Sequence, residues 1–228
     1  MDPRLEEVVF SRLAAAEAAR DPDRLAFVFE NGEHPAEPLT TGGLALGGDK
    51  LAAALAGAGL GRGDRVAVML RNHPEFLVSL AANAKMALPT VPVDPRSRGA
   101  KLAYFLGFAE CSGLITADYV VADPAAAEVI RASGVRTWVL STPEGRAAGF
   151  DVSGWPSLNE VLDGPEVGTP GEQVESLGEP WLLAYTSGTT GDPKAIEFTY
   201  ERMSLYRGLP RFFGYQPDDV TYTGLSLT

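Results

Sequence analysis

The sequence predicts an α/β protein whose sheet is largely parallel and flanked by helices. Between about residues 65 and 140, short apolar runs typical of buried strands alternate with segments of helical spacing. Alternation of this kind requires right-handed crossovers and therefore a largely parallel sheet. In addition, 45% of the 228 residues are hydrophobic, which is enough to bury a sizeable core without disulfides or a structural metal.

The amino-terminal part is expected to hold two helices and a strand. Asp2 and Pro3 are typical of an N-cap followed by proline in the first helical turn, and apolar spacing supports a helix to about Arg20. The other elements expected here are a strand at 25–29, a tight turn at Asn31-Gly32, and a helix at about 44–58 that Gly47 and Gly48 weaken.

The alternating region supplies the centre of the predicted sheet. Its apolar runs predict strands at 65–70, 90–93, 113–116 and 137–140. Helices are expected at 74–87, 98–109 and 124–132, the first of them capped by Asn72. Pro92 suggests that the strand at 90–93 has an edge position or a bulge, because proline cannot donate to a sheet ladder.

The last third of the chain lacks the regular alternation of strands and helices. Residues 141–180 are rich in Gly, Pro and acidic side chains, so we expect a long surface connection with one short helix near 158–162. After it come predicted strands at 181–185, 195–199 and 220–223 and a helix at 200–213. The predicted organisation is an α/β N-terminal subdomain over 1–140, an irregular connection over 141–180, and a segment 181–228 that begins another part.

Composition excludes several classes of function. A formal charge of −11 argues against nucleic-acid binding, because a phosphate backbone favours clustered Lys and Arg. Cys111 is the only cysteine, which rules out an internal disulfide, and no Cys/His cluster offers a zinc site. The acidic start is unlike a signal peptide, and no apolar run is long enough for a stable membrane span. We therefore expect a soluble, cytoplasmic protein that holds no metal of its own.

The stretch YTSGTTGDPK, residues 185–194, is the clearest chemical signal. Glycines allow successive backbone N–H groups to converge on an anion, Ser and Thr hydroxyls add donors, and a lysine adds a mobile positive charge. This combination suits a polyphosphate. A Walker A loop does not match, because Pro193 precedes Lys194 and Ala195 follows it. A mobile polar hairpin loop is the structural alternative.

Residues 185–194 resemble the phosphate-binding signature of adenylate-forming enzymes, which include acyl-CoA synthetases, luciferases and the adenylation domains of peptide synthetases. Two further segments resemble the family's motifs in order and spacing, namely 61–70 followed by Asn72, Glu75 and Phe76, and 85–95. The likeness covers about residues 25–228. It implies the N-terminal subdomains of the adenylate-forming fold, with the large domain cut short at its phosphate-loop segment, 181–228.

The resemblance also implies a two-step reaction. A small carboxylic acid attacks ATP in the presence of Mg²⁺, giving an acyl-adenylate and pyrophosphate, and a thiol, usually that of coenzyme A, then displaces AMP. In the family this loop contacts the outer phosphates. Residue by residue, the resemblance assigns hydroxyl donors to Thr186, Ser187, Thr189 and Thr190, backbone amides to Gly188 and Gly191, and a charge on the leaving pyrophosphate to Lys194.

Two departures from the family limit this interpretation. Ala195 stands where most members have glycine, a hint of ligases of the fatty-acid-transport and carnitine type and so of fatty acid metabolism. The later motifs, which supply the adenine and ribose pocket, the magnesium-binding glutamate and the adenylating lysine, are not found before Thr228. No catalytic residue is therefore identified, and the isolated chain is expected to be catalytically incomplete.

Two alternative functions stay open. The chain could be a non-catalytic interaction or regulatory half that pairs with a separate chain, or that self-associates, because a truncated sheet leaves apolar surface and strand edges unpaired. It could also belong to an unrelated nucleotide-binding phosphotransferase.

Other notable residues have structural interpretations. The run Gly59-Leu-Gly-Arg-Gly63 precedes a strand, whereas a dinucleotide fingerprint follows one, so we expect a turn. The remaining interpretations are a buried, unreactive Cys111, a helix entry at His73, a helix core of Tyr200, Tyr206, Phe212 and Phe213, and a solvated Asp218-Asp219 pair.

Overall fold

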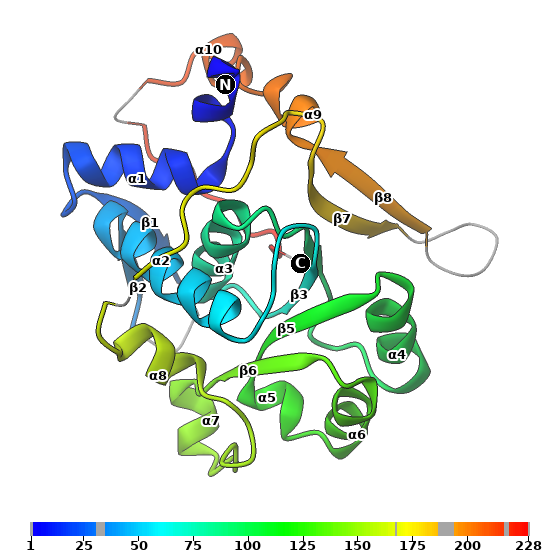
Figure 1. Ribbon diagram of the computed structural model, residues 1–228. Helices are drawn as coiled ribbons and strands as arrows, with labels where there is room; N and C mark the ends of the chain where they lie inside the picture. Colours follow the sequence, from blue (N-terminus) through cyan, green and yellow to red (C-terminus); the bar gives the residue numbers. More distant parts are fainter. Residues whose placement is uncertain (1, 31–34, 167, 187–193, 217–218, 228) are drawn as a thin grey trace.

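The computed structural model describes residues 2–30, 35–166, 168–186, 194–216 and 219–227, and a six-stranded sheet forms its centre (Figure 1). The strand order is β6-β5-β3-β4-β7-β8, with β8 antiparallel to β7 and the other neighbours parallel. The strands are β3 Arg65–Met69, β4 Thr90–Pro92, β5 Cys111–Ala117, β6 Arg136–Leu140, β7 Pro180–Thr186 and β8 Lys194–Thr199. The predicted α/β fold class with a largely parallel sheet is confirmed.

Both faces of the sheet are covered by helices, as the apolar strand runs require. Along β3, Val66 and Val68 belong to the core on one face, whereas Ala67 and Met69 belong to the core on the other. The first face packs against α2 Thr41–Gly57 and α3 Pro74–Lys85, with α1 Phe10–Arg20 beside them, and the second packs against α4 Gly99–Phe108 and α6 Pro124–Ser133. Figure 1 shows these two groups of helices on opposite sides.

Smaller elements complete the molecule. A 3₁₀-helix at Pro3–Glu7 precedes α1, and β1 Leu25–Phe29 and β2 Glu37–Thr40 form a separate antiparallel pair. The short helices are α5 Asp118–Val121, α7 Pro143–Ala147, α8 Leu158–Asp163, α9 Tyr200–Ser204 and α10 Leu209–Phe212. The sequence does not predict β2, α5 or α7. The turn expected at Asn31-Gly32 lies outside the described residues.

The structure corrects three of the predicted elements. The first helix is interrupted, because the 3₁₀-helix capped by Asp2 ends before α1 begins at Phe10. The helix expected over 200–213 divides into α9 and α10, and the described residues within 220–223 form no strand. The division has a physical reason, because Gly208 and Pro210 interrupt the helical segment.

The edge position or bulge expected for β4 is also wrong, because its register with β3 is regular. This strand lies between β3 and β7, with Pro92 opposite Val68 of β3. Its pairing with β7 consists of Thr90 opposite Leu182. Proline is tolerated here because β4 pairs with β7 at Thr90, two residues earlier. The ladder between β4 and β7 therefore requires no N–H donor from Pro92.

Two glycines that weaken α2 in isolation allow it to pack closely on α3. A Cβ atom at Gly48 would lie 2.9 Å from the Cβ atom of Ala81, and one at Gly47 would lie 3.2 Å from both methyl carbons of Val78. The two glycines therefore lower the intrinsic helix propensity of α2 but allow its axis to approach that of α3 closely.

Candidate functional site

The predicted phosphate loop is the connection of the β7–β8 hairpin. Since β7 is parallel to β4, its last residue, Thr186, lies at the carboxyl edge of the sheet. Ligands of open α/β sheets bind at this edge. The antiparallel register runs from Pro180 opposite Thr199 to Thr186 opposite Lys194, so both ends of the loop are fixed by the sheet (Figure 1).

The structure places two of the seven predicted binding residues. Thr186 is the last residue of β7, and Lys194 is an exposed residue that begins β8 directly opposite it. Ser187, Gly188, Thr189, Thr190 and Gly191 lie outside the described residues. The roles given to all seven remain predictions, but the base of the loop has the position that a ligand at the carboxyl edge requires.

Tyr185 anchors the base of this hairpin to α4. Its ring centroid lies 4.4 Å from that of Phe105, and the rings of Tyr104 and Phe108 surround it at 6.5 and 6.3 Å. The Tyr185 hydroxyl donates a 2.8 Å hydrogen bond to the carbonyl of Phe105. Burial raises the pKa of this phenol, so the donor stays protonated. The sequence gives no signal for this contact, because the partners are 80 residues apart.

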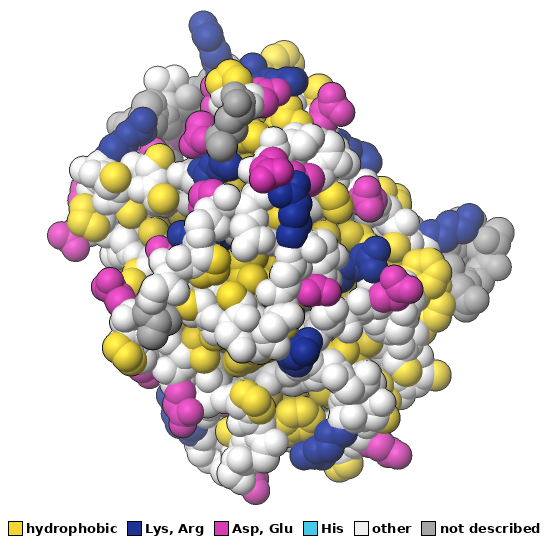
Figure 2. Space-filling model, in the orientation of Figure 1, with side chains coloured by type: hydrophobic (Ala, Val, Ile, Leu, Met, Phe, Trp, Pro, Cys, Tyr) yellow, Lys and Arg dark blue, Asp and Glu magenta, His cyan; other side chains and the backbone are white. Residues whose placement is uncertain are grey.

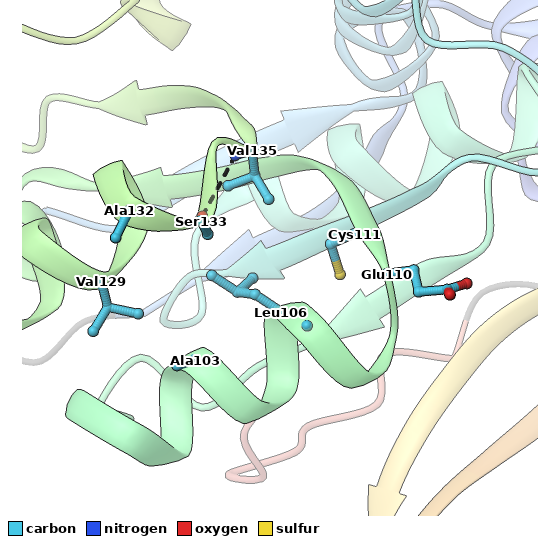
Figure 3. Close-up of a pocket in the computed structure, with 9 residues that line it drawn as sticks. Ala103, Leu106, Glu110, Cys111, Val129, Ala132, Ser133 and Val135 are labelled. Carbon is cyan, nitrogen blue, oxygen red and sulfur yellow. Dashed lines mark hydrogen bonds between the residues drawn. The ribbon is translucent and has the colours of Figure 1, made fainter.

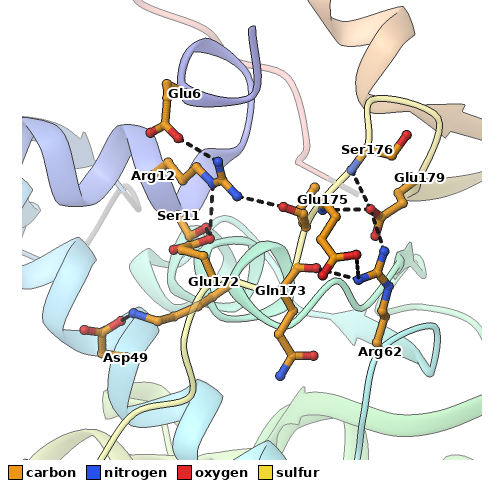
Figure 4. Close-up of polar contacts among 12 residues, drawn as sticks. Glu6, Ser11, Arg12, Asp49, Arg62, Glu172, Gln173, Glu175, Ser176 and Glu179 are labelled. Atoms are coloured by element: carbon orange, nitrogen blue, oxygen red, sulfur yellow. Dashed lines mark hydrogen bonds and ion pairs between the residues drawn. The ribbon is translucent and has the colours of Figure 1, made fainter. Parts of the chain in front are cut away.

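A polar strap formed by residues 172–179 leads directly into β7 (Figure 4). Buried Arg12 of α1 holds its first part, donating to the Val174 carbonyl at 2.7 Å and to Glu6 at 2.6 Å. Glu172 accepts from the Ser11 hydroxyl at 2.9 Å, with its carboxylate 3.7 Å from the Arg12 Nε. The long connection is thus tied to α1 before the chain enters the hairpin.

Arg62, from the turn between α2 and β3, holds the second part of the strap. Its guanidinium donates to the Gln173 carbonyl at 2.9 Å and pairs with Glu175 and Glu179 at 3.0 and 2.9 Å. Within the strap, the Glu179 carboxylate accepts the backbone N–H groups of 175 and 176, both at 2.8 Å. The sequence predicts an irregular connection over 141–180. Val174 and Leu177 are apolar residues within an acidic stretch, and this pattern is the sequence signal that the strap packs against the rest of the protein.

Asn72 connects the end of β3 to the last described part of the chain. Its side-chain amide donates to the Leu225 carbonyl at 3.0 Å, and its side-chain oxygen accepts from the Leu227 N–H at 2.9 Å. The prediction that Asn72 caps a helix is wrong, because His73 is the N-cap residue of α3. Neighbouring strands lie about 4.8 Å apart, so the ends of β3 and β7, with β4 between them, are roughly 10 Å apart.

His73 and Tyr119 lie beside Asn72 at the same edge. The His73 ring is buried, stacks on Tyr119 with centroids 6.0 Å apart, and has its Nδ1 3.9 Å from a carboxylate oxygen of Glu37. Burial lowers the pKa of His73, which keeps the imidazole neutral near pH 7. The prediction of a helix entry at His73 is confirmed.

Cys111 is remote from this edge, because it begins β5 at the amino end of the sheet. It borders a cavity of about 410 Å³ between α4 and α6, which Leu106 and Val129 also line (Figure 3). Burial of the sulfur raises the pKa of the thiol to about 12, so it is a neutral, weakly reactive group, but Cys111 as a whole is half-buried and not buried as expected.

Three other sequence interpretations can be compared with the structure. The turn at 59–63 is confirmed, with φ of 83° at Gly59 and 88° at Gly63. Of the four aromatic residues expected in a helix core, Tyr200 is buried, but Tyr206, Phe212 and Phe213 are exposed, so that prediction is largely wrong. Asp218 is not described, and the Asp219 carboxylate accepts the Gln216 N–H at 2.8 Å.

The described residues contain no group of three or more His, Cys, Asp or Glu side chains that could hold a metal ion. None of the helices in the described ranges is long and apolar enough to cross a membrane. Basic side chains are scattered over the face in Figure 2 rather than gathered into a stripe that would suit nucleic acid.

Comparison with known proteins identifies relatives over almost the whole chain. Residues 14–228 match the family model described as AMP-binding enzyme. The chain is 31% identical over 206 residues to the sulfoacetate–CoA ligase of Cupriavidus necator, an alignment that covers 89% of this chain and 38% of that ligase.

Solved structures agree with the fold. The acetoacetyl-CoA synthetase of Streptomyces lividans aligns with a TM-score of 0.80 and 25% identity, covering 96% of this chain and 34% of the synthetase. An ATP-bound RpMatB–BxBclM chimera aligns with a TM-score of 0.73 and 24% identity, covering 93% of this chain and 39% of the chimera. The chain thus spans less than half the length of these proteins. It belongs to the AMP-binding family of adenylate-forming enzymes, whose N-terminal part it matches.

Proposed function

We propose that this chain forms the pyrophosphate-binding part of an ATP-dependent acyl-CoA synthetase. In the first step a carboxylate oxygen attacks the α-phosphorus of ATP, and the bond from that phosphorus to the bridging oxygen breaks, releasing pyrophosphate. In the second step the thiol of coenzyme A attacks the acyl carbonyl and AMP leaves. The observation that carries the proposal is the hydroxyl-rich loop set between Thr186 and Lys194 at the carboxyl edge of the sheet.

In this proposal the chain acts on the leaving group. Pyrophosphate gains negative charge as the bridging bond breaks, and the Lys194 ammonium, the loop hydroxyls and the loop amides stabilise that charge. Such groups are effective because the hairpin fixes both ends of the loop before ATP binds. Mg²⁺ would enter with the nucleotide phosphates, and we assign it no ligand among the described residues.

The comparisons support some parts of this proposal more directly than others. A sulfoacetate–CoA ligase and an ATP-bound neighbour support a carboxylic acid, coenzyme A and ATP as the substrates. The fatty-acid preference is suggested by Ala195. A cytoplasmic location, and the division into 1–140, 141–180 and 181–228, remain part of the proposal.

Replacing Lys194 with alanine should weaken pyrophosphate binding about tenfold, because one charge-assisted contact is lost, and a factor of ten corresponds to about 1.4 kcal/mol. The measurement is calorimetric titration of the 228-residue chain with magnesium pyrophosphate. Arg20→Ala is the matched control, since it removes an exposed cation from α1, which lies across the molecule from β8 in Figure 1. Wild-type protein that binds no pyrophosphate, or a Lys194 variant that binds equally well, would contradict the proposal.

The isolated chain is expected to catalyse no adenylate formation, because it covers 38% of the related ligase and supplies no catalytic residue that we can identify. ATP–pyrophosphate exchange with a panel of carboxylic acids measures this. Exchange above the no-enzyme rate, by a preparation of verified mass, would show that the active site is complete.

A non-catalytic interaction half is the second candidate function. It is favoured by the large apolar side chains that the last part of the chain exposes. The two candidates differ in pyrophosphate binding, which an interaction module does not need.

A further inference from the structure

The packing of α4 against α6 leaves an open cavity of about 410 Å³ between the two helices (Figure 3). Its walls include Leu106 of α4, Val129 of α6, Cys111 at the start of β5, and Val135 before β6. Pockets that bind small molecules have volumes of about 300–1,000 Å³ and mostly apolar walls. The size and the lining of this cavity therefore both suit a small-molecule ligand.

A glycine in α4 helps to keep the cavity open. Gly107 borders the cavity, and a Cβ atom at this position would meet no neighbour within 4 Å. Glycine is among the least favourable residues inside a helix. In α2, Gly47 and Gly48 allow close packing against α3, whereas no neighbour approaches Gly107 in this way. The absent side chain of Gly107 therefore leaves open space rather than a close helix contact.

The polar groups around the cavity are already bonded within the protein. The Ser133 hydroxyl donates to the Ile130 carbonyl at 2.7 Å and accepts from the Val135 N–H at 3.4 Å. The Glu110 carboxylate pairs with Arg65 at 3.0 Å and extends away from the other labelled side chains in Figure 3. A molecule in the cavity is therefore held by apolar contacts rather than by hydrogen bonds to these groups.

The charge of the lining disfavours anions. Among the described residues that border the cavity there is no lysine, arginine or histidine, and Glu110 is the one charged member. An anionic ligand would lose hydration without gaining a counter-charge, which is costly. The carboxylic acid, ATP and coenzyme A of the proposed reaction are all anions. The cavity therefore suits a different, uncharged ligand.

We propose that the cavity between α4 and α6 is a binding site for a small uncharged apolar molecule of about the size of two fused aromatic rings. The ligand lies against Leu106, Val129, Val135 and the neutral thiol of Cys111. An apolar cavity of about 150 Å³ stays dry and binds benzene, so the larger space here admits a second ring. The proposal goes beyond the proposed function and does not depend on it.

The site is separate from the phosphate loop. Phe105 and Phe108 of α4 contact the ring of Tyr185 at the base of the loop. Leu106 and Gly107, which border the cavity, lie on a different face of the helix, because successive residues turn by about 100°. Pyrophosphate at the loop and an apolar ligand in the cavity should therefore not compete.

The first test uses Cys111 as the reporter, because it is the only cysteine of the chain. The 228-residue chain is treated with N-ethylmaleimide with and without indole, an uncharged bicyclic molecule, and mass spectrometry measures the rate at which the single adduct forms. Indole should slow labelling at least threefold, with half-protection below about 1 mM, an affinity that burial of a ligand of this size can supply. Unchanged labelling at the solubility limit of indole would overturn the proposal.

A charged analogue tests the class of ligand. Indole-3-carboxylate carries the same rings and one negative charge, so it should require at least tenfold higher concentration for the same protection of Cys111. Equal protection by the two compounds would show that the cavity does not select uncharged molecules, which contradicts the proposal.

The second test fills the cavity. Gly107→Leu should weaken indole binding at least tenfold without lowering the melting temperature, because leucine is the better helix former and its Cβ has room. Gly57→Leu is the matched control, since Gly57 ends α2 and also has no neighbour within 4 Å of a Cβ position. Methyl NMR shifts of Val129 and Val135 measure binding. A Gly107→Leu protein that binds indole as tightly as the wild type would refute this site, and the labelling test remains decisive if that variant does not fold.

Other results would identify a different use of the cavity. Protection of Cys111 by pyrophosphate would overturn the proposal in favour of a site continuous with the phosphate loop. Labelling that slows as protein concentration rises, together with a dimer by light scattering, would overturn it in favour of a second copy that fills the cavity. Protection by indole together with no pyrophosphate binding would refute the proposed function and leave this site standing.

Discussion

Replacing Gly145 with alanine is expected to destabilise the protein by about 3 kcal/mol or more, because the new methyl group has no room. A Cβ atom at this position would lie 2.0 Å from a carboxylate oxygen of Asp118. That carboxylate is buried and cannot simply turn away, since it accepts from the Thr142 N–H at 2.5 Å, the Thr142 hydroxyl at 3.0 Å and the Tyr119 N–H at 2.7 Å.

The protein is destabilised because either Asp118 or α7 must move, and each movement disrupts buried hydrogen bonds. If Asp118 moves, a buried charge loses its donors, and if α7 moves, its N-cap contact from the Gly145 N–H to the Thr142 hydroxyl is lost. Urea unfolding followed by circular dichroism measures the change. Gly171→Ala is the matched control, because a Cβ atom there meets nothing within 4 Å, and its effect should stay within about 0.5 kcal/mol. Equal midpoints for the two variants would contradict the packing described here.

Replacing Arg12 with alanine should destabilise the protein by about 1–3 kcal/mol, the range for leaving a buried hydrogen-bond acceptor without its donor. The Arg12 side chain is 5% exposed and bridges α1 to the Val174 carbonyl, with Glu6 and Glu172 beside it. Alanine would leave the carbonyl without its donor and the partly buried Glu172 carboxylate without its cation. Arg12→Met should cost less, because it keeps an apolar stem of similar length in the buried space.

The same variants separate a general loss of stability from a local one. Hydrogen exchange of the Arg12→Ala protein should rise first in the strap, residues 172–179, and in β7, before β3 and β5 are affected. Arg20→Ala removes an exposed arginine that pairs with Glu17 on the same helix, and should change stability by no more than about 0.5 kcal/mol. Uniform acceleration across the sheet would show that the strap is not tied through Arg12.

Much of the fold could be predicted from the sequence because both faces of the sheet are buried. The run at 65–69 is continuously apolar after Arg65, and a buried parallel strand is the structure that such a run favours. Prediction failed for features that depend on contacts between elements distant in the sequence. Pro92 is acceptable in a central strand only because β7 pairs with β4 earlier, at Thr90, and no local pattern reports that register.

The site could be predicted only as far as it is local in sequence. Ten consecutive residues carry the phosphate signature, and the structure places Thr186 and Lys194 at the base of the loop. The contacts that hold the hairpin join distant residues, such as Tyr185 to Phe105 and Arg12 to Val174, and leave no recognisable spacing. The exposure of Phe212 was unpredictable for a further reason, because periodicity shows which face is apolar and not whether a partner covers it.

The single pairing of β4 with β7 has a consequence for the order of folding. Thr90 and Leu182 lie about ninety residues apart, whereas β3, β4, β5 and β6 follow one another at short separations along the chain. Contacts between distant residues form late, because the entropy of closing the intervening loop must be overcome first. On a ribosome the strands up to β6 can therefore assemble before the β7–β8 hairpin has been synthesised, and the hairpin docks onto a sheet that already exists.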